Sequence, residues 1–242
     1  METIARKLIT AGRDLADELR PLEFSDPVSH TYLTVDYARD GYEKYLEKFA
    51  GTTKRVLMLG MNPGPYGMAQ TGVPFGEIAM VRDWMRLSPE IGKPAIEHPK
   101  RRVLGMDCPK SEVSGRRLWG LFSEKFPQAE DFFAEHLVIN FCPLIWMKDT
   151  GANLTPDKIK ASEMVMVDAA CQKHLRRLIE LTKPEFLIGV GAYAGKQMAL
   201  AKAELGVAGT IGKILHPSPA SPAANRGWAE AAEKQLRDMG AW

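Results

Sequence analysis

The sequence is poor in cysteine and has no Cys-x-x-Cys pair. Its three cysteines, Cys108, Cys142 and Cys171, lie far apart, which is too few for a four-thiolate zinc or iron–sulfur site and an odd number for a disulfide framework. The five histidines stand in unrelated contexts without the spacing of metal ligands. We therefore expect free thiols in a reducing compartment and no metal site.

Long apolar runs and a strong charge imbalance are also missing. The longest apolar runs, at residues 56–59 and 186–190, are far shorter than a bilayer crossing, and residues 1–7 lack the apolar stretch of a signal peptide. The formal net charge is only +2, which permits binding to nucleic acid without predicting it. These features predict an intracellular, cytoplasmic protein (nuclear in a eukaryote) that does not bind membranes.

The composition that remains is that of a globular protein, with 45% apolar and 26% charged residues. Short runs rich in Val, Ile and Leu alternate with longer segments of helical periodicity. The predicted strands are residues 55–59, 137–139, 185–190 and 213–215. The predicted helices are residues 4–19, 192–205 and 222–239, and a longer helix that begins at Thr155-Pro156 and ends before Pro184.

Strands that alternate with helices pair in parallel and are covered by helices on both faces. We therefore predict an α/β fold with three layers, α/β/α, and a central, mostly parallel four-stranded sheet in a single domain of residues 1–242. Residues 1–23 are expected to form an N-terminal helical extension packed on this domain. Residues 88–114, rich in Pro and Gly, are expected to form a long irregular loop.

Polar side chains stand at the ends of the predicted strands, where ligands bind in parallel α/β proteins. The first strand leads into Asn62-Pro63-Gly64-Pro65, the second into Asn140-Phe141-Cys142-Pro143 and the fourth into His216-Pro217-Ser218-Pro219. Each segment taken alone is consistent with an ordinary turn, a helix cap or a surface histidine. Together they predict a rigid polar pocket at the carboxyl edge of the sheet.

The third strand leads into Gly189-x-Gly191-x-x-Ala194, which follows the pattern of a dinucleotide fingerprint. However, no acidic residue ends a strand about 20 positions further on, where one would bind a ribose. A nucleotide-dependent α/β enzyme is therefore an alternative with little support. The Gly-x-Ser-x-Gly elbow of a serine hydrolase is absent from the sequence.

Two motifs connect the chain to a known family. Residues 60–76 read Gly-Met-Asn-Pro-Gly-Pro-Tyr-Gly-Met-Ala-Gln-Thr-Gly-Val-Pro-Phe-Gly. They closely resemble the first motif of the single-strand-selective monofunctional uracil-DNA glycosylases. Residues 216–219, His-Pro-Ser-Pro, resemble the second motif of that family. Similar segments follow the family's order at residues 24–28, 98–101, 108–115, 138–144 and 151–156. The resemblance covers most of the chain and implies a uracil-DNA glycosylase fold that hydrolyses the bond between uracil and deoxyribose.

The resemblance also implies roles for residues at motif positions. Asn62 would hold the attacking water, and His216 would donate a hydrogen bond to uracil O2. Phe75 would stack on the flipped base and Asn140 would recognise its N3–H and O4, because one Asn side chain offers both a donor and an acceptor. Met61 is expected to contribute to the base pocket. The family needs neither metal nor cofactor, and no motif lysine suggests a lyase step.

Gly64 stands where other uracil-DNA glycosylases carry a tyrosine that closes the C5 side of the base. Two roles, which can hold together, are open for this glycine: a backbone turn with positive φ, and room for a C5 substituent or a water. The second role predicts that 5-hydroxymethyluracil is also a substrate.

The implied partner is DNA, single-stranded or duplex, that contains uracil and is bound by a monomer. The expected DNA contacts are Ser218, Pro219, Ala220 and Arg226, with Ser218 on a phosphate. The family commonly has an arginine at the place of Ala220, where it enters the duplex as a wedge, and Arg226 offers only weak compensation. Residues 100–102 and 116–117 form basic clusters that either pair with phosphates or are solvated. The alternative function is a non-catalytic DNA-binding protein that keeps the glycosylase fold.

Overall fold

The structure is a computed structural model that describes residues 2–242. At its centre lies a four-stranded parallel sheet with the strand order β3-β2-β6-β7. Its strands are β2 (Val56–Gly60), β3 (His136–Asn140), β6 (Phe186–Val190) and β7 (Thr210–Ile214). This confirms the predicted central sheet. β7 begins three residues before the strand predicted at 213–215, because an edge strand that exposes Ile211 and Lys213 lacks a continuous apolar run.

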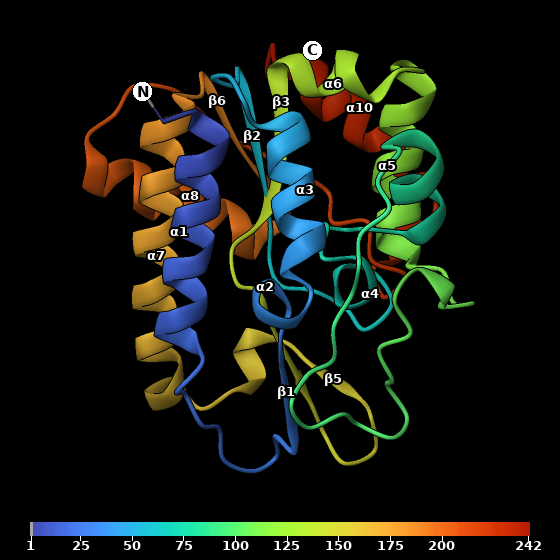
Figure 1. The fold of residues 1–242 in the computed structure, drawn as a ribbon. Helices are drawn as coiled ribbons and strands as arrows, with labels where there is room; N and C mark the ends of the chain where they lie inside the picture. The colour runs from blue at the N-terminus through green and yellow to red at the C-terminus, as the bar shows by residue number, and fades with distance from the viewer. Residues whose placement is uncertain (1) are drawn as a thin grey trace.

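Helices cover both faces of the parallel sheet, as the three-layer prediction requires. Figure 1 shows α1, α7 and α8 on one side of the strands and α5, α6 and α10 on the other. The helices on the first side are α1 (Ile4–Leu19), α7 (Ala161–Thr182) and α8 (Ala192–Leu205). Those on the second side are α5 (Val113–Lys125), α6 (Ala129–Glu135) and α10 (Trp228–Asp238). α3 (Arg39–Phe49) packs beside α1 and α6.

Two helix boundaries differ from the prediction. Thr155-Pro156 begins only a 3₁₀ turn, η3 (Pro156–Lys158), and α7 starts at Ala161 after it. The C-terminal segment is divided into α9 (Pro222–Asn225) and α10, because Gly227 between them has a φ of +137° and interrupts the helix. In contrast, α1 and α8 occupy the predicted residues.

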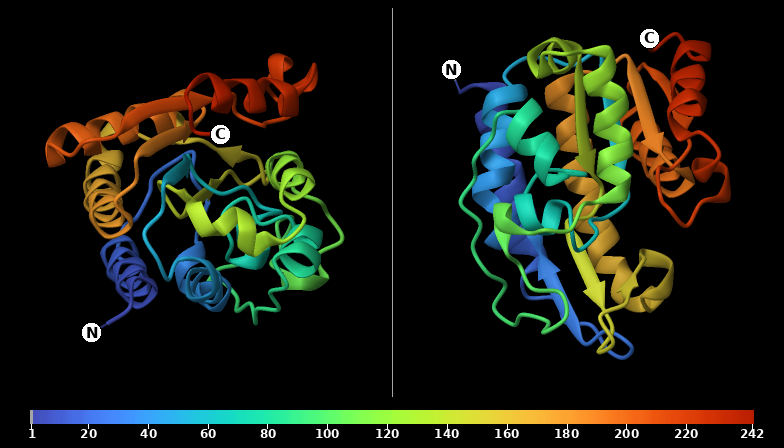
Figure 2. Two further views of the ribbon diagram at one scale, coloured as in Figure 1. Left: turned by 90° about the horizontal axis from the view of Figure 1, so that it is seen from above. Right: turned by 90° about the vertical axis from the view of Figure 1, so that its right-hand side faces the viewer.

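A second sheet, which the sequence analysis did not predict, extends the fold beyond the carboxyl ends of the parallel strands (Figure 2, right). It is antiparallel and consists of β1 (His30–Leu33), β4 (Leu144–Met147) and β5 (Asn153–Leu154) in the order β1-β4-β5. Every side chain of β4 is buried, so its sequence lacks the alternation that marks a strand.

Short elements complete the chain, and they include the loop predicted at residues 88–114. That loop is irregular except for one 3₁₀ turn and the start of α5 at its end. The short elements are α2 (Thr34–Tyr37), α4 (Met68–Thr71), the π-helical turn η1 (Met80–Trp84) and η2 (Gly105–Asp107). Across residues 2–242, every helix is too short or too polar to cross a membrane.

An aromatic cluster lies in the core between α5 and α6. The rings of Phe122 and Phe132 stack with their centroids 4.4 Å apart, and Trp119 contacts Phe132 edge to face at 6.1 Å. All three side chains are completely buried. The indole N–H of Trp119 donates a hydrogen bond to the backbone carbonyl of Phe75 at 3.0 Å, which ties this core to the functional site.

Candidate active site

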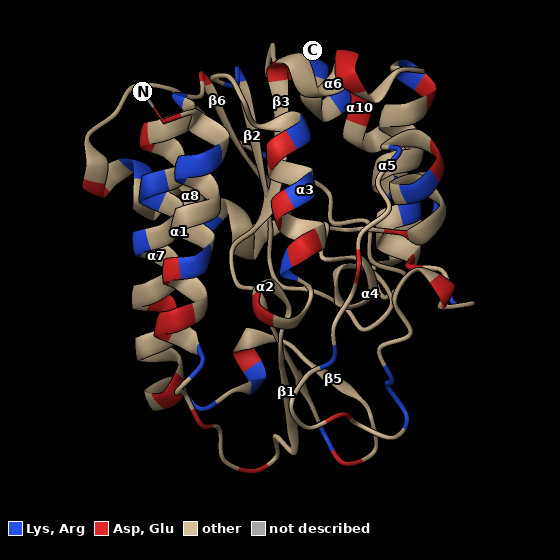
Figure 3. Cartoon of the chain, viewed as in Figure 1, with Lys and Arg blue, Asp and Glu red and all other residues tan. Residues whose placement is uncertain are grey.

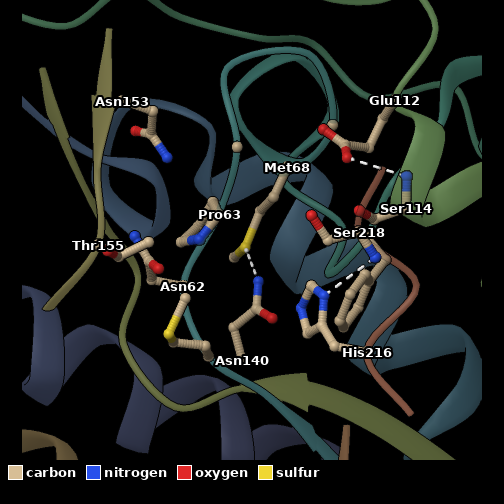
Figure 4. A pocket seen from close by; sticks show the side chains of 14 residues that line it. Asn62, Pro63, Met68, Glu112, Ser114, Asn140, Asn153, Thr155, His216 and Ser218 are labelled. Atoms are coloured by element: carbon tan, nitrogen blue, oxygen red, sulfur yellow. Dashed lines mark hydrogen bonds between the residues drawn. The ribbon is translucent and has the colours of Figure 1, made fainter. Parts of the chain in front are cut away.

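A cavity of about 170 Å³ lies at the carboxyl edge of the parallel sheet (Figure 4). The end of β3 and the segments that follow β2 and β7 supply the residues that were predicted to form a site. Of these, the cavity is lined by Met61, Asn62, Gly64, Phe75, Asn140, His216 and Ser218. The cavity is also lined by residues that were not predicted to be site residues, which are Pro63, Gly67, Met68, Glu112, Ser114, Asn153 and Thr155.

Three predicted residues lie outside this cavity. Pro219 and Ala220 continue the loop after Ser218 and are exposed, and Arg226 is exposed at the end of α9. They are therefore accessible from solvent and do not line the cavity.

Asn62 is oriented by the second sheet. Its amide group donates a hydrogen bond from Nδ2 to the backbone carbonyl of Leu144 in β4, at 3.1 Å. Its Oδ1 accepts no hydrogen bond from residues 2–242. The side chain is thus held by its donor while its acceptor stays available to a ligand or a water.

Asn140 is the last residue of β3 and is only 8% exposed. Its Nδ2 contacts the Sδ of Met68 at 3.4 Å, and a thioether is a weak acceptor. Gly60, which pairs with Asn140 across the sheet, has no side chain: a Cβ there would lie 2.3 Å from Asn140 Oδ1 and 2.5 Å from the Phe75 ring. The glycine thus permits the amide and the ring to meet, and the amide keeps most of its hydrogen-bonding capacity for a ligand.

Phe75 has a φ of +52°, a conformation that costs a non-glycine residue about 1–3 kcal/mol. Its carbonyl accepts hydrogen bonds from Trp119 Nε1 at 3.0 Å and from the Glu77 backbone N–H at 2.7 Å. The Thr71 hydroxyl donates to the next carbonyl, that of Gly76, at 3.1 Å. These bonds hold the strained backbone, so the ring is a rigid wall of the cavity, with its centroid 6.3 Å from that of His216.

His216 follows β7 and carries its ring hydrogen on the side of the cavity. Its Nδ1 accepts a hydrogen bond from the Ser218 backbone N–H at 3.1 Å, so the neutral ring has its proton on Nε2. Burial lowers the pKa of His216 below its ordinary value. At neutral pH the residue is therefore an uncharged imidazole with a fixed donor.

Arg117 holds the loop that bears His216. Its guanidinium donates to the carbonyls of Pro217 and Ser218 at 3.0 and 3.3 Å and to Asn225 Oδ1 at 2.9 Å. Asn225 in turn donates to the Pro219 carbonyl at 2.9 Å. Arg117 is therefore a brace of this loop, and this role was missed because its partners lie about a hundred positions away in the chain.

Arg101, in the other basic cluster, is likewise bound within the protein. Its Nε donates to the Gly151 carbonyl at 2.7 Å, and its guanidinium donates to the hydroxyl of Tyr66. This bond joins the irregular loop to the segment that follows β2. Arg101 therefore stabilises the rim of the cavity.

Two glycines, one in β6 and one directly after it, serve packing. A Cβ at Gly189 would lie 2.1 Å from the backbone N of Gly195 in α8. A Cβ at Gly191, which has a φ of +92°, would lie 3.1 Å from Cβ of His216 and 3.2 Å from its ring atom Cδ2. The spacing that resembles a dinucleotide fingerprint is thus explained by close approach of strand, helix and histidine.

Gly64 is not among the glycines with positive φ, so the turn with positive φ that was predicted as one of its roles is wrong.

Acidic, histidine and cysteine side chains do not gather into a metal site anywhere in residues 2–242: no three of them are placed to hold an ion. The cysteines Cys108, Cys142 and Cys171 are free thiols. The chemical groups of the cavity are three amides, three hydroxyls, an imidazole, a carboxyl, an aromatic ring and two thioethers.

The fold and this site define a class of base-excising enzyme. The family model of the uracil DNA glycosylase superfamily matches residues 47–238. The crystal structure of wild-type SMUG2 from Pedobacter heparinus superposes with a TM-score of 0.72 over 100% of this chain and 98% of that one. The sequence identity is 18%, so this similarity establishes the fold.

Curated relatives narrow the class. The single-strand selective monofunctional uracil DNA glycosylase of Bos taurus is 44% identical over 226 residues, which cover 93% of this chain and 83% of the bovine protein. That of Rattus norvegicus is 42% identical over 244 residues, or 99% of this chain and 88% of the rat protein. The chain belongs to the single-strand-selective monofunctional uracil-DNA glycosylase family, as its motifs predicted.

Gly115 in α5 offers a test of how firmly the site is braced. A Cβ at Gly115 would lie 2.0 Å from the Phe75 carbonyl oxygen, so Gly115→Ala must displace the backbone of the strained residue. We expect a lower melting temperature and uracil excision slowed by about 10²-fold, the scale of a misplaced reactive group. Gly120→Ala is the matched control: nothing lies within 4 Å of its Cβ, so it should stabilise the helix by about 0.5–1 kcal/mol. Equal melting temperatures and rates for both variants would contradict the brace.

Proposed function

We propose that this uracil-DNA glycosylase flips uracil into the cavity at the carboxyl edge of its sheet and hydrolyses the glycosidic bond with Asn62 and His216. The activity is that of a monofunctional DNA repair hydrolase acting on DNA. One observation carries the assignment of roles: side chains from three separate strand ends converge on one cavity of about 170 Å³.

Base recognition falls to Phe75 and Asn140. The Phe75 ring offers a flat apolar surface on which the flipped base stacks. The amide of Asn140 presents a donor and an acceptor to O4 and N3–H of uracil, whereas cytosine would leave both groups unpaired. Since Asn140 is 8% exposed and has only a thioether partner, a mismatched base leaves it unsatisfied, which costs about 1–3 kcal/mol.

Bond cleavage depends on stabilising the departing base. The bond between C1′ and N1 breaks with its electron pair moving onto the uracil ring. Water held by Asn62 Oδ1 adds its oxygen to C1′ and loses a proton, and the departing uracil anion gains one, so that neutral uracil is the product. An amide is too weak a base to drive this step alone. The Nε2–H of neutral His216 meets the negative charge that develops on uracil O2, and a donor placed in this way is worth about 10²–10³ in rate.

The DNA-binding surface is local to the mouth of the cavity. Figure 3 shows Lys and Arg interspersed with Asp and Glu over α1, α3 and α7, so these helices offer no single-signed face to a phosphate backbone. Ser218, which lines the cavity, is proposed to contact a phosphate, and the exposed Pro219 and Ala220 to face the gap left by the flipped base. Alanine is too short to fill that gap, which favours single-stranded over paired substrate.

The finer properties of the enzyme follow from the same site. We propose that it acts as a monomer of one domain, because one chain supplies every residue of the cavity. Its substrates would include 5-hydroxymethyluracil as well as uracil, in single strands and in duplexes.

Its place of action would be inside the cell, where genomic DNA lies. The free thiols are compatible with a reducing compartment.

His216→Ala and Asn62→Ala should each reduce single-turnover release of uracil from a single-stranded oligonucleotide by at least about 10²-fold. The first variant removes the donor to the leaving base and the second removes the acceptor for water. Circular dichroism should show that both fold, since neither side chain belongs to the core. A variant that retained the wild-type rate would disprove the role of its residue, and an inactive wild type would favour the non-catalytic DNA-binding alternative.

Asn140→Asp should abolish uracil release at neutral pH. An ionised carboxylate has no donor for O4 and repels the charge that develops on the base. The measurement is the single-turnover rate, with binding to an abasic oligonucleotide as the control for intact DNA affinity. If uracil release continued at the wild-type rate, Asn140 would not be the residue that recognises the base.

Ala220→Arg should raise the rate on duplex uracil more than the rate on single strands, because the longer side chain offsets part of the unstacking cost of a few kcal/mol. Ala223→Arg, also exposed and on the same C-terminal segment, is the control that adds the same charge away from the gap. Rates are compared at fixed salt concentration. If both variants raise both rates by one factor, the gain is electrostatic and the wedge hypothesis is wrong.

A further inference from the structure

The side of the cavity at Gly64 is bounded by the carboxyl of Glu112. A Cβ built on Gly64 would meet Oε2 of Glu112 at 2.9 Å, and its three nearest atoms all belong to this glutamate. A Cβ on Gly67 would lie 2.9 Å from Glu112 Cγ. Glu112 therefore fills the space that side chains at these two glycines would have occupied, and Figure 4 shows its carboxyl at the edge of the cavity.

The position of this carboxyl is fixed by α5. Glu112 is the N-cap of the helix, and its Oε1 accepts a hydrogen bond from the Ser114 backbone N–H at 3.2 Å. With Oε1 engaged, Oε2 is the oxygen that faces the Gly64 side. Burial, and to a smaller extent the charge of nearby Glu77, raises the pKa of Glu112 above its ordinary value.

The orientation proposed for the base brings its C5 atom to this side. If Asn140 binds N3–H and O4 while His216 binds O2, the remaining edge, C5 and C6, faces the segment after β2. We propose that Glu112 is the residue that selects the C5 substituent of the bound base, through a hydrogen bond that its Oε2 accepts. This inference rests on the proposed function and adds to it a specificity-determining residue.

The chemistry of a carboxylate explains the selection. An ionised carboxylate only accepts hydrogen bonds, so it favours a C5 hydroxymethyl group, whose O–H donates. Uracil itself, with hydrogen at C5, leaves room for a water that solvates Oε2. The methyl group of thymine displaces that water and supplies no donor, which leaves a desolvated carboxylate and opposes binding.

Glu112→Gln tests the inference because it changes one atom of the group. Glutamine keeps an oxygen for the Ser114 N–H and replaces Oε2 by an amino group that only donates. The formyl group of 5-formyluracil only accepts hydrogen bonds, whereas the hydroxymethyl group can donate one. We expect the single-turnover rate on 5-formyluracil, divided by the rate on 5-hydroxymethyluracil, to rise by about 10-fold or more relative to wild type. Comparing each ratio with that of the wild type cancels the intrinsic leaving ability of the bases.

Glu77→Gln is the matched control. Glu77 is also a buried carboxyl that caps a helical turn, with Oε2 accepting from the Met80 N–H at 3.1 Å, but it does not line the cavity. Its ratio of rates should equal that of the wild type. A loss of helix capping alone would lower the melting temperature of either variant without changing the preference between the two bases.

Gly64→Ala provides a second test that leaves the cap of α5 intact. Its methyl group would crowd Oε2 and should lower the rate on 5-hydroxymethyluracil relative to uracil by several-fold. The inference is overturned if Glu112→Gln releases uracil but leaves the ratio of formyl to hydroxymethyl substrate unchanged, or if Gly64→Ala leaves the ratio of hydroxymethyluracil to uracil unchanged. A wild-type enzyme that releases no uracil is a different result, which overturns the proposed function itself.

Discussion

The absence of a side chain at Gly60 is the constraint on which the site depends. Gly60 ends β2 directly opposite Asn140 at the end of β3, and any Cβ there would overlap both the Asn140 amide and the Phe75 ring. Parallel pairing places these strand ends at one edge, and the glycine lets two side chains share the space above it. A recognition amide and a stacking ring can therefore lie in one small cavity.

Long-range hydrogen bonds then make that cavity rigid. Trp119 holds the strained Phe75 from the core side, and Arg117 holds the His216 loop through three acceptors. Both residues lie on α5, whose N-cap, Glu112, also borders the cavity. A single helix thus positions the aromatic wall, the imidazole loop and the carboxyl at the C5 side. Such preorganisation matters because the proposed mechanism has no strong base and depends on donors already in place when charge develops.

Local sequence patterns predicted the elements that bury a simple apolar face or run. The strands of the parallel sheet and helices α1 and α8 were found because their apolar residues follow one another or recur at helical spacing. The antiparallel sheet and helices α3, α5 and α6 were missed. β4 is buried on both sides and β5 has two residues, so neither shows alternation, and their identity as strands depends on partners elsewhere in the chain.

By itself, the sequence determined the class of fold, the family and the polar residues at the strand ends, because motifs and apolar periodicity are properties of neighbouring residues. Only the tertiary structure decided that Glu112 borders the cavity beside Gly64, that Arg117 is a brace and that Gly64 does not need a positive φ. The first two depend on groups that lie tens of positions apart and meet only when α5 packs against the ends of the strands. The chemical groups that a residue offers are given by its type in the sequence, whereas the groups that it contacts are determined by how the helices and strands pack.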